Sequence, residues 1–264
     1  MSNFYFTISA GRTGTAWLAD FLKTNLDITA IHEPLEIDDF GINMPDIRVM
    51  RSFNDRGLDD HCNQFWQRKF ENLGTYDDYA ETNHTLAKCG LVEWVAKNKG
   101  NNNFKFIILK RNKISQCISY LTRGDFINVT IEWQWYLSPA YRNIILSPEP
   151  FLKMGQIGRA LWYIHEMECR QEYYKYQFGS DLDMFDITLE DVTKNAGAGR
   201  LLEWLDIDKE PIIPPPKNQA RVKTDNELRK NIERIVSAIN FDSKTIALDY
   251  INSGRKLCDT LPGS

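Results

Sequence analysis

The first residues of the chain that could carry out chemistry form a short polar loop with two glycines. An apolar, β-prone segment over residues 3–9 runs into this loop, which contains Gly11, Arg12 and Gly14, and a helix-like segment over residues 15–25 follows at once. A strand that turns directly into a helix points several free backbone N–H groups at one place, where the helix dipole adds partial positive charge. With the guanidinium of Arg12 beside them, these groups predict a pocket for a phosphate-like anion.

This loop differs from the common nucleotide-binding loop, Gly-x-x-x-x-Gly-Lys-Ser/Thr, in which the lysine contacts the phosphates and the hydroxyl binds Mg²⁺. Only two residues separate Gly11 from Gly14, Thr15 stands where that lysine would be, and the cation, Arg12, lies inside the loop. A short Gly-x-x-Gly also occurs in ordinary strand-to-helix turns, where the glycines only ease the corner. The hydroxyl residues around Arg12 favour the anion site over the plain turn.

A second segment that could carry chemistry follows a strand predicted over residues 104–110. An enzyme that hydrolyses nucleotides would hold Mg²⁺ with an acid at such a strand end, whereas this strand ends in the cations Lys110 and Arg111. A helix-like segment over residues 114–123, which contains Ser119, comes next. Taken alone, the cations are typical of a solvated basic turn. Together with the first loop they indicate anion recognition without a metal, and no metal ligands are predicted.

The two segments together resemble the sulfotransferases that use 3′-phosphoadenosine 5′-phosphosulfate (PAPS). In that family a Lys/Arg-Ser/Thr-Gly-Thr-Thr/Ser-Trp loop holds the 5′-phosphosulfate, and residues 12–17 match it with Ala16 in place of a hydroxyl residue. A second family signature is an Arg-Asn pair with a serine eight residues after the arginine, and both side chains take the 3′-phosphate. Arg111 and Ser119 stand at that spacing.

The resemblance implies a donor, a product and an acceptor class. PAPS would be the sulfuryl donor, adenosine 3′,5′-bisphosphate the product, and a hydroxyl or amine of a small molecule or carbohydrate the acceptor. Arg12 would also be catalytic, since charge develops beside it on the leaving oxygen. The residues implied for donor binding are Gly11, Arg12, Thr13, Gly14, Thr15, Ala16, Trp17, Arg111 and Ser119. Trp17 could stack on the adenine or be a core aromatic of its helix.

Two residues are candidates for the general base that takes the acceptor's proton as the acceptor attacks sulfur. Glu33 follows the strand predicted over residues 28–32, where carbohydrate and tyrosyl-protein members of the family carry a glutamate. His84 follows the strand predicted over residues 78–82 and resembles the histidine of the Lys-Thr-His motif in cytosolic members. Either could instead be structural, Glu33 as a loop acid paired with an arginine and His84 as the neighbour of a helix start. We favour Glu33 as the base, with His84 orienting it or contacting the substrate.

Two further similarities are weaker. Residues 184–192 are similar to the family's strand that ends in Tyr-Glu-Asp-Leu. Lys217, Arg221 and Lys223 follow a proline-rich connector over residues 211–216, in the region where family members close the nucleotide with a basic loop. A solvated basic loop explains the same three residues.

These residues are placed by a predicted alternation of strands and helices. Strands are predicted over residues 3–9, 28–32, 78–82, 104–110 and 182–187, and helices over residues 15–25, 61–71, 86–98, 114–123, 156–178, 190–206 and 225–239. Such alternation predicts an α/β fold of the P-loop NTPase type, with a central parallel sheet, helices on both faces and ligands at the carboxyl ends of the strands. We expect a single domain over residues 1–264, in which an aromatic-rich, helical region near residues 125–178 contacts the acceptor.

Composition narrows the classes of function. The chain has 264 residues with 42% apolar content, enough for one sizeable core. Its net charge of −4 argues against a general surface for nucleic acid or anionic membranes. No apolar stretch is long enough to span a bilayer, and the N-terminus lacks the features of a signal peptide. Five scattered cysteines suggest reduced thiols in a cytoplasmic protein, and the His61-Cys62 pair is not a metal-binding signature.

Three classes of function stay open on the sequence. The first is a PAPS-dependent sulfotransferase. The second is a nucleotide or small-molecule kinase with an atypical phosphate loop, against which stand the missing Gly-Lys-Ser/Thr and the cationic strand end. The third is a nucleotide-binding module without catalysis. The sequence leaves the identity of the acceptor and the oligomeric state open.

Overall fold

A five-stranded, all-parallel sheet with the strand order β2-β3-β1-β4-β5 forms the centre of the computed structural model, which describes residues 2–127, 132, 134–217 and 226–259. The strands are β1 (Asn3–Ile8), β2 (Thr29–Ile31), β3 (Asp78–Glu81), β4 (Asn103–Lys110) and β5 (Asp183–Thr188). Each begins and ends within one residue of its predicted position. The central strand is β1, the strand that leads into the anion loop.

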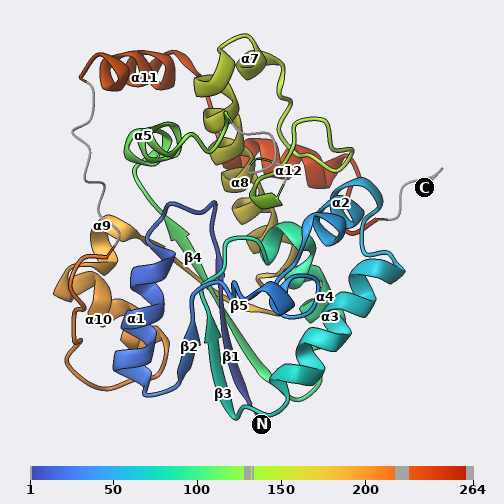
Figure 1. Cartoon of the computed structure of the whole chain (residues 1–264), viewed down its shortest axis with the longest axis vertical. Helices are drawn as coiled ribbons and strands as arrows, with labels where there is room; N and C mark the ends of the chain where they lie inside the picture. The colour runs from blue at the N-terminus through green and yellow to red at the C-terminus, as the bar shows by residue number, and fades with distance from the viewer. Residues whose placement is uncertain (1, 128–131, 133, 218–225, 260–264) are drawn as a thin grey trace.

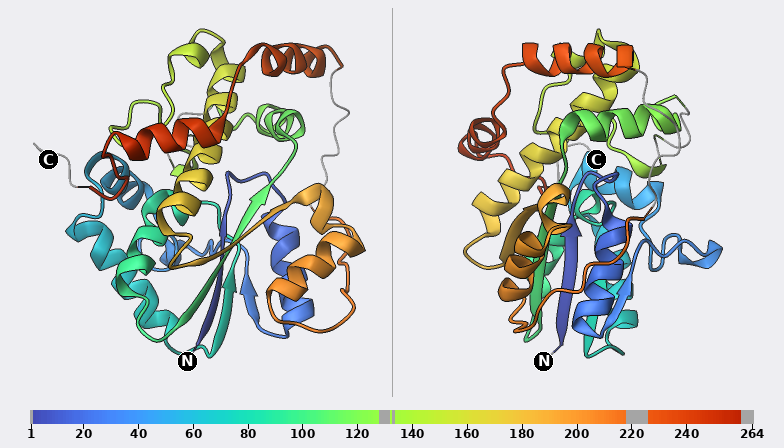
Figure 2. Two further views of the ribbon diagram at one scale, coloured as in Figure 1. Left: turned by 180° about the vertical axis from the view of Figure 1, so that it is seen from behind. Right: turned by 90° about the vertical axis from the view of Figure 1, so that its left-hand side faces the viewer.

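Both faces of the sheet are covered by helices, because side chains of the central strand alternate between two cores. Phe4, Phe6 and Ile8 belong to the larger core, to which the helices α3 (Asp60–Leu73), α4 (Leu91–Asn98) and α8 (Gly155–Phe178) contribute. Tyr5 packs in a smaller core with α1 (Thr15–Leu26) and α10 (Asn195–Trp204). In Figure 1, α1 and α10 lie on one side of the sheet and α3 and α4 on the other, and the left view of Figure 2 shows the same arrangement from behind. The predicted fold class is confirmed.

The helices mostly follow the predicted ranges. The α-helices are α1 (Thr15–Leu26), α2 (Ile47–Arg56), α3 (Asp60–Leu73), α4 (Leu91–Asn98), α5 (Lys113–Arg123), α7 (Glu149–Leu152), α8 (Gly155–Phe178), α9 (Leu189–Val192), α10 (Asn195–Trp204), α11 (Asn226–Ala238) and α12 (Ser243–Asn252), and the short 3₁₀ helices are η1 (Ile37–Asp39) and η2 (Ala87–Cys89). The single helix predicted over residues 86–98 is wrong in one respect. Gly90 has a φ of +87°, and this left-handed residue separates η2 from α4.

Three elements differ from the sequence prediction in other ways. The helix predicted over residues 190–206 is two helices, α9 and α10, with a turn between them. Helices α2 and α12 were not predicted at all. Each is preceded by an aspartate whose carboxylate accepts from the first turn: Asp46 from the N–H of Arg48, and Asp242 from the N–H of Lys244.

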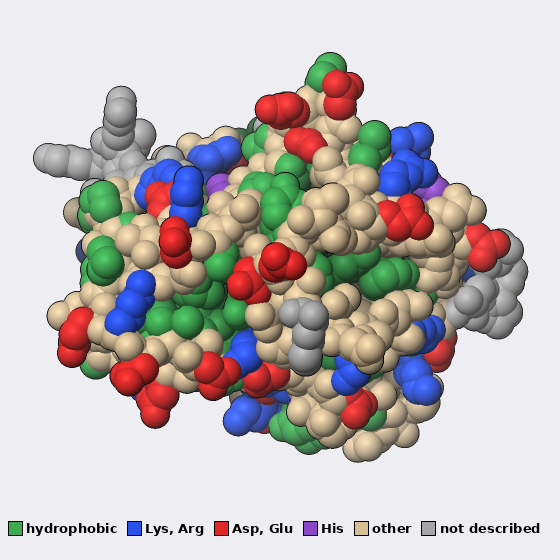
Figure 3. Space-filling model, turned by 90° about the horizontal axis from the view of Figure 1, so that it is seen from below, with side chains coloured by type: hydrophobic (Ala, Val, Ile, Leu, Met, Phe, Trp, Pro, Cys, Tyr) green, Lys and Arg blue, Asp and Glu red, His purple; other side chains and the backbone are tan. Residues whose placement is uncertain are grey.

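Beyond the carboxyl ends of the strands lies a helical layer that includes α5, α7 and α11 (Figure 1). The long helix α8 runs from this layer down along the sheet and packs against α5 and α12. Within the described residues, no helix has the length and apolar character needed to cross a membrane. The opposite end of the molecule, seen in Figure 3, carries acidic and basic side chains interspersed among apolar ones. Ligands of parallel sheets bind at the carboxyl ends of the strands, so the functional site is expected at the end of the molecule that carries the helical layer.

Candidate active site

The loop between β1 and α1 presents the first turn of a helix at the carboxyl end of the central strand. Gly14 precedes α1 with a φ of +90°, and a Cβ at this position would lie 2.4 Å from Cδ1 of Leu189, so glycine fits both the backbone and the space. Among the described residues no side chain caps α1, whose first helical hydrogen bond runs from the N–H of Leu18 to the carbonyl of Gly14. The N–H groups of residues 15–17 are therefore available to an anion.

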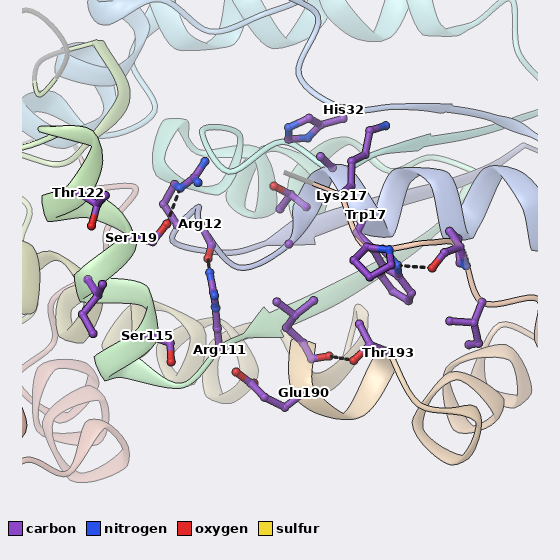
Figure 4. Close-up of a pocket in the computed structure, with 18 of the residues that line it drawn as sticks. Arg12, Trp17, His32, Arg111, Ser115, Ser119, Thr122, Glu190, Thr193 and Lys217 are labelled. Atoms are coloured by element: carbon purple, nitrogen blue, oxygen red, sulfur yellow. Dashed lines mark hydrogen bonds between the residues drawn. The ribbon is translucent and has the colours of Figure 1, made fainter. Parts of the chain in front are cut away.

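A cavity of about 600 Å³ opens beside this helix start (Figure 4). Its walls come from the loop and α1, from α5, from α9, and from the connector that follows α10. The polar and charged residues that line it are Arg12, Thr15, His32, Arg111, Ser115, Ser119, Thr122, Glu190, Thr193, Lys217 and Arg229. The two motifs that the sequence analysis singled out thus lie on one cavity.

Arg12 physically joins the two motifs. Its Nε donates to Oγ of Ser119 at 3.0 Å, and its main-chain carbonyl accepts from Nη1 of Arg111 at 2.9 Å. Arg12 has a φ of +53°, a left-handed conformation that is uncommon for a residue with a Cβ and that is often found at functional sites. Burial lowers the pKa of Arg111, and the charge of Arg12 lowers it further against the opposing effect of Glu190. Two guanidinium groups this close favour an anionic ligand.

Glu33 and His84 lie next to each other beside the loop, but neither is part of the cavity wall. Oε1 of Glu33 is 3.5 Å from Nε2 of His84, and the two side chains are 13% and 9% exposed. The imidazole of His84 packs on the loop so closely that a Cβ on Gly11 would lie 3.0 Å from its Cγ. Glu33 has a φ of +48°, so both Glu33 and Arg12 are held in left-handed backbone. The structure brings both base candidates to the anion loop.

Burial changes the proton affinity of this pair in opposite directions. It raises the pKa of the Glu33 carboxyl, although the charges of His32, Lys88 and Arg12 and the main-chain N–H of His84 act against the rise. Burial lowers the pKa of His84 well below its usual value, and the nearby charge of Lys88 lowers it further. The His84 ring is therefore neutral near pH 7, and Glu33 binds a proton more readily than an exposed carboxyl.

Two residues that were implied for donor binding, Trp17 and Thr13, are buried. Trp17 lines the cavity, but it is buried, its Nε1 donates to the carbonyl of Pro214 at 3.0 Å, and its ring stacks on Phe21. Thr13 does not line the cavity; it lines a separate, much smaller one that Gln171 also borders. Within the described residues, Oγ1 of Thr13 has no hydrogen-bond partner. Thr13 can therefore serve the anion site only through its main chain.

Several lining residues were missed as site residues or were singled out only weakly. His32 was not singled out; its Nδ1 lies 2.9 Å from the carbonyl of Thr82, and its Nε2 lies 3.7 Å from the Glu33 carboxylate. Lys217 pairs with Asp20 in α1 at 2.7 Å. Arg221 and Lys223, the other basic residues predicted to follow the connector, lie outside the described residues.

Glu190 and Arg229 reach the cavity from elements that the motifs do not include. Oε1 of Glu190 accepts from the N–H of Asn112 at 3.2 Å, which fixes α9 against the start of α5. Arg229 comes from α11, which packs on α5. The similarity of residues 184–192 to the Tyr-Glu-Asp-Leu strand end could have indicated Glu190. No sequence pattern indicated Arg229.

Aromatic side chains surround the His84 side of the site. The ring of Tyr136 stacks on His84 with centroids 5.8 Å apart, and Trp135 lies 6.0 Å from the same ring and 6.2 Å from Phe40. Trp135 and Tyr136 belong to the region near 125–178 that was predicted to contact the acceptor; residues 128–131 and 133 of it lie outside the described residues.

Acidic side chains on the strands on either side of β1 form ion pairs with lysines. Glu81, the last residue of β3, is completely buried and pairs with Lys69 at 2.6 Å. Beyond β4, Lys110 pairs with Asp186 of β5 at 2.9 Å. In the described part of the chain, no group of three or more His, Cys, Asp or Glu side chains is arranged to hold a metal ion.

The chain is similar to eleven chains of solved structures, among which are two sulfotransferases. No protein-family model matches the chain, and no curated protein matches it. The sulfotransferase domain from the curacin biosynthetic pathway is 10% identical with a TM-score of 0.46, over 97% of this chain and 99% of that one. A sulfotransferase from Alicyclobacillus acidocaldarius is 15% identical with a TM-score of 0.49, over 96% of each chain. Similarities of this size do not assign a function, which has to come from the residues of the site.

Proposed function

We propose that this protein is a sulfotransferase that moves the sulfuryl group of PAPS to a hydroxyl or amine of a small molecule or carbohydrate. The observation that carries the proposal is the meeting of the anion loop with Arg111 and Ser119 on one cavity, joined through Arg12. Its volume of about 600 Å³ lies in the range of small-molecule and cofactor sites. A nucleotide with phosphate groups on the 5′ and 3′ positions of its ribose would contact Arg12 through the first and Arg111 through the second.

The donor is assigned to two groups of residues. The N–H groups at the start of α1, with Arg12 and the hydroxyl of Thr15, hold the 5′-phosphosulfate. Arg111 and Ser119 take the 3′-phosphate, and Lys217 closes the far side of the cavity. Arg12 donates to Ser119 at 3.0 Å, and donor binding would replace this hydrogen bond by bonds from each side chain to the ligand.

Sulfuryl transfer then needs no covalent enzyme intermediate. The acceptor oxygen or nitrogen attacks sulfur and gives its proton to the carboxylate of Glu33, a new bond to sulfur forms, and the bond from sulfur to the phosphate oxygen breaks. The electron pair of that bond stays on the phosphate oxygen, where Arg12 and the helix N–H groups stabilise the developing charge. Adenosine 3′,5′-bisphosphate leaves. A reducing compartment such as the cytoplasm completes the proposal, because the five cysteines are free thiols.

Thermal unfolding separates the proposal from its alternatives. Adenosine 3′,5′-bisphosphate at about a hundred times its Kd should stabilise the protein by roughly 2.7 kcal/mol, and ATP with Mg²⁺ should stabilise it less at equal concentration. The measurement is the unfolding midpoint against ligand concentration. Stabilisation by ATP with Mg²⁺ alone would point to the kinase. A protein that binds adenosine 3′,5′-bisphosphate but transfers no sulfuryl group to any of a broad panel of phenols, alcohols, amines and sugars would be a binding module.

The assignment of the 3′-phosphate has its own test. Arg111→Ala should weaken binding of adenosine 3′,5′-bisphosphate by about 1.5–3 kcal/mol, the contribution of a hydrogen bond to a charged group. Calorimetry with adenosine 5′-phosphate, which lacks the 3′-phosphate, should show a much smaller loss. Arg123→Ala is the matched control, because this cation lies at the other end of α5, the helix that follows Arg111, and pairs with Asp125 outside the cavity wall. Equal losses for both nucleotides would show that Arg111 does not read the 3′-phosphate.

A further inference from the structure

A completely buried lysine stands behind the candidate base. Lys88, in η2, has an exposed fraction of 0%, which is rare for a lysine. Its Nζ lies 2.8 Å from Nδ1 of His84 and 2.8 Å from the hydroxyl of Tyr163, and it also contacts the main-chain carbonyl of Trp135. The aromatic rings of Tyr136 and Tyr163 lie 5.4 and 5.2 Å from the same atom. None of these partners is a carboxylate, and within the described part of the chain Lys88 has no direct ion pair.

The three contacts fix the direction of every hydrogen bond around this lysine. An ammonium group has three hydrogens and no lone pair, and the carbonyl of Trp135 can only accept. The hydroxyl of Tyr163 donates its own hydrogen to the carbonyl of Ala10 at 2.7 Å, so toward Lys88 it also accepts. The third hydrogen therefore goes to Nδ1 of His84. Because this ring is neutral, its single proton must be on Nε2, the atom that faces the Glu33 carboxylate.

We propose that Lys88 is a positioning residue: it holds His84 in the tautomer with the proton on Nε2 and directs that proton at Glu33. The proposal rests on the proposed function only in treating Glu33 as the base. A histidine with Nε2 protonated donates to the carboxylate and cannot take the acceptor's proton through the same atom. The geometry thus assigns the two candidates different roles, Glu33 to proton transfer and His84 to its orientation.

Buried contacts connect the base to the donor loop. Oε1 of Glu33 lies 3.5 Å from Nε2 of His84, and hydrogen bonds then run from His84 through Lys88 and Tyr163 to the carbonyl of Ala10, the residue that precedes the anion loop. The carboxylate and the loop are therefore held relative to each other by buried groups. Such a link suits a reaction in which the acceptor must be placed between a base and a bound phosphosulfate.

The charge state of Lys88 decides the tautomer. Burial lowers the pKa of Lys88 to about 7, with Glu33 and Cys89 opposing the change and Arg170 adding to it. A neutral amine keeps two hydrogens for Trp135 and Tyr163 and offers a lone pair to His84, which then carries its proton on Nδ1. We therefore expect the tautomer to reverse as the pH rises through the pKa of Lys88.

The surrounding groups keep their charge state in this range. Burial raises the pKa of Tyr136 and Tyr163 well above their usual value and that of Cys89 to about 12, so all three stay protonated. Although Arg170 is buried, the charge of Glu166 raises its pKa, so it stays charged. The guanidinium of Arg12 also lowers the pKa of His84. Among the described residues, Glu33 contacts His84 and His32 contacts Glu33, so the signals of these residues must be followed together with those of His84.

Nitrogen NMR of the histidine rings tests the proposal without any assay of activity. The chain has four histidines, and the His84 signals are assigned by their loss in His84→Asn. Below the pKa of Lys88 the proton should be on Nε2, and above it on Nδ1. In Lys88→Met the reversal should disappear. Lys105→Met, a control at a second largely buried lysine far from His84, should keep it. A proton on Nδ1 at low pH in the unaltered protein would overturn the proposal even if Lys88→Met fails to fold.

Enzyme kinetics then separate the two proposals. Removal of the Lys88 charge should raise the pKa of Glu33, so the acidic limb of the pH profile of kcat/KM should move to higher pH in Lys88→Met, with donor affinity unchanged. If the protein transfers no sulfuryl group but the tautomer reverses as described, the proposed function fails and the role of Lys88 in orienting His84 stands. If transfer occurs and neither the tautomer nor the acidic limb depends on Lys88, the positioning role fails alone.

Discussion

Glu33→Gln is expected to lower kcat by roughly 10²–10⁴ while leaving the binding of adenosine 3′,5′-bisphosphate unchanged. Glutamine keeps the shape of the side chain and can still bond to His84, but it cannot take the acceptor's proton. Glu33 is not part of the cavity wall assigned to the nucleotide, which is why binding should survive. Single-turnover sulfuryl transfer, with nucleotide affinity measured by calorimetry on the same variant, tests both halves of this prediction.

The pH dependence provides an independent check on the base. Burial raises the pKa of Glu33, so the acidic limb of kcat/KM should lie above the pH at which an exposed carboxyl titrates. Activity is lost as the pH falls through this pKa, because the protonated carboxyl no longer accepts a proton. His84→Asn should have a smaller effect than Glu33→Gln. An active Glu33→Gln beside an inactive His84→Asn that still binds nucleotide would assign the proton transfer to His84.

Arg12→Ala is expected to reduce kcat by about 10²–10³, the usual loss when one preorganised donor to a developing negative charge is removed. The affinity for adenosine 3′,5′-bisphosphate should fall less, since the helix N–H groups and Arg111 remain. Arg12→Lys should restore part of the rate, because it returns a positive charge to the loop. Rates and product affinities of the two variants, measured in parallel, test these expectations.

Ser119→Ala is the control that separates charge from structure at Arg12. It removes the hydroxyl to which Arg12 donates at 3.0 Å but leaves the guanidinium in place. If Arg12→Lys lowers kcat as much as Arg12→Ala does, the loop requires the fork shape of the guanidinium and not only its charge. In that case Ser119→Ala should reproduce part of the damage.

The fold could be predicted from the sequence largely because the two longest apolar strands, β1 and β4, lie next to glycine, asparagine and charged residues. Residues 3–8 and 103–110 are buried on both faces of the sheet, and such strands read as continuous apolar segments. Helix α2 was not predicted because its ten residues are mostly polar and its apolar face becomes apparent only when Val49, Met50 and Phe53 pack in the core. Tertiary packing, not helix propensity, forms this helix.

The candidate site likewise contains residues that the sequence could identify and residues that only the tertiary structure brings to it. Its motifs are local: the loop of residues 11–17 and the Arg111–Ser119 pair each lie at the junction of one strand with one helix, so spacing along the chain was enough to find them. Arg229 and Lys88 could not be found like this. Arg229 reaches the cavity only because α11 packs on α5, and the role of Lys88 depends on hydrogen bonds between residues far apart in the sequence.

The strand order β2-β3-β1-β4-β5 has a consequence for how the protein is made. β1 leaves the ribosome before its neighbours β3 and β4, and Asn3 pairs with Asn103, one hundred residues later. At roughly 5–20 residues per second, translation of that interval takes roughly 5–20 s. The edge of β1 that faces β3 stays unpaired until Asp78 is made, and the edge that faces β4 stays unpaired for the whole interval, in a nascent chain whose contacts are still mostly local. The central position that gives the loop between β1 and α1 its rigid base therefore leaves an apolar strand edge open to wrong pairing until β4 has been synthesised.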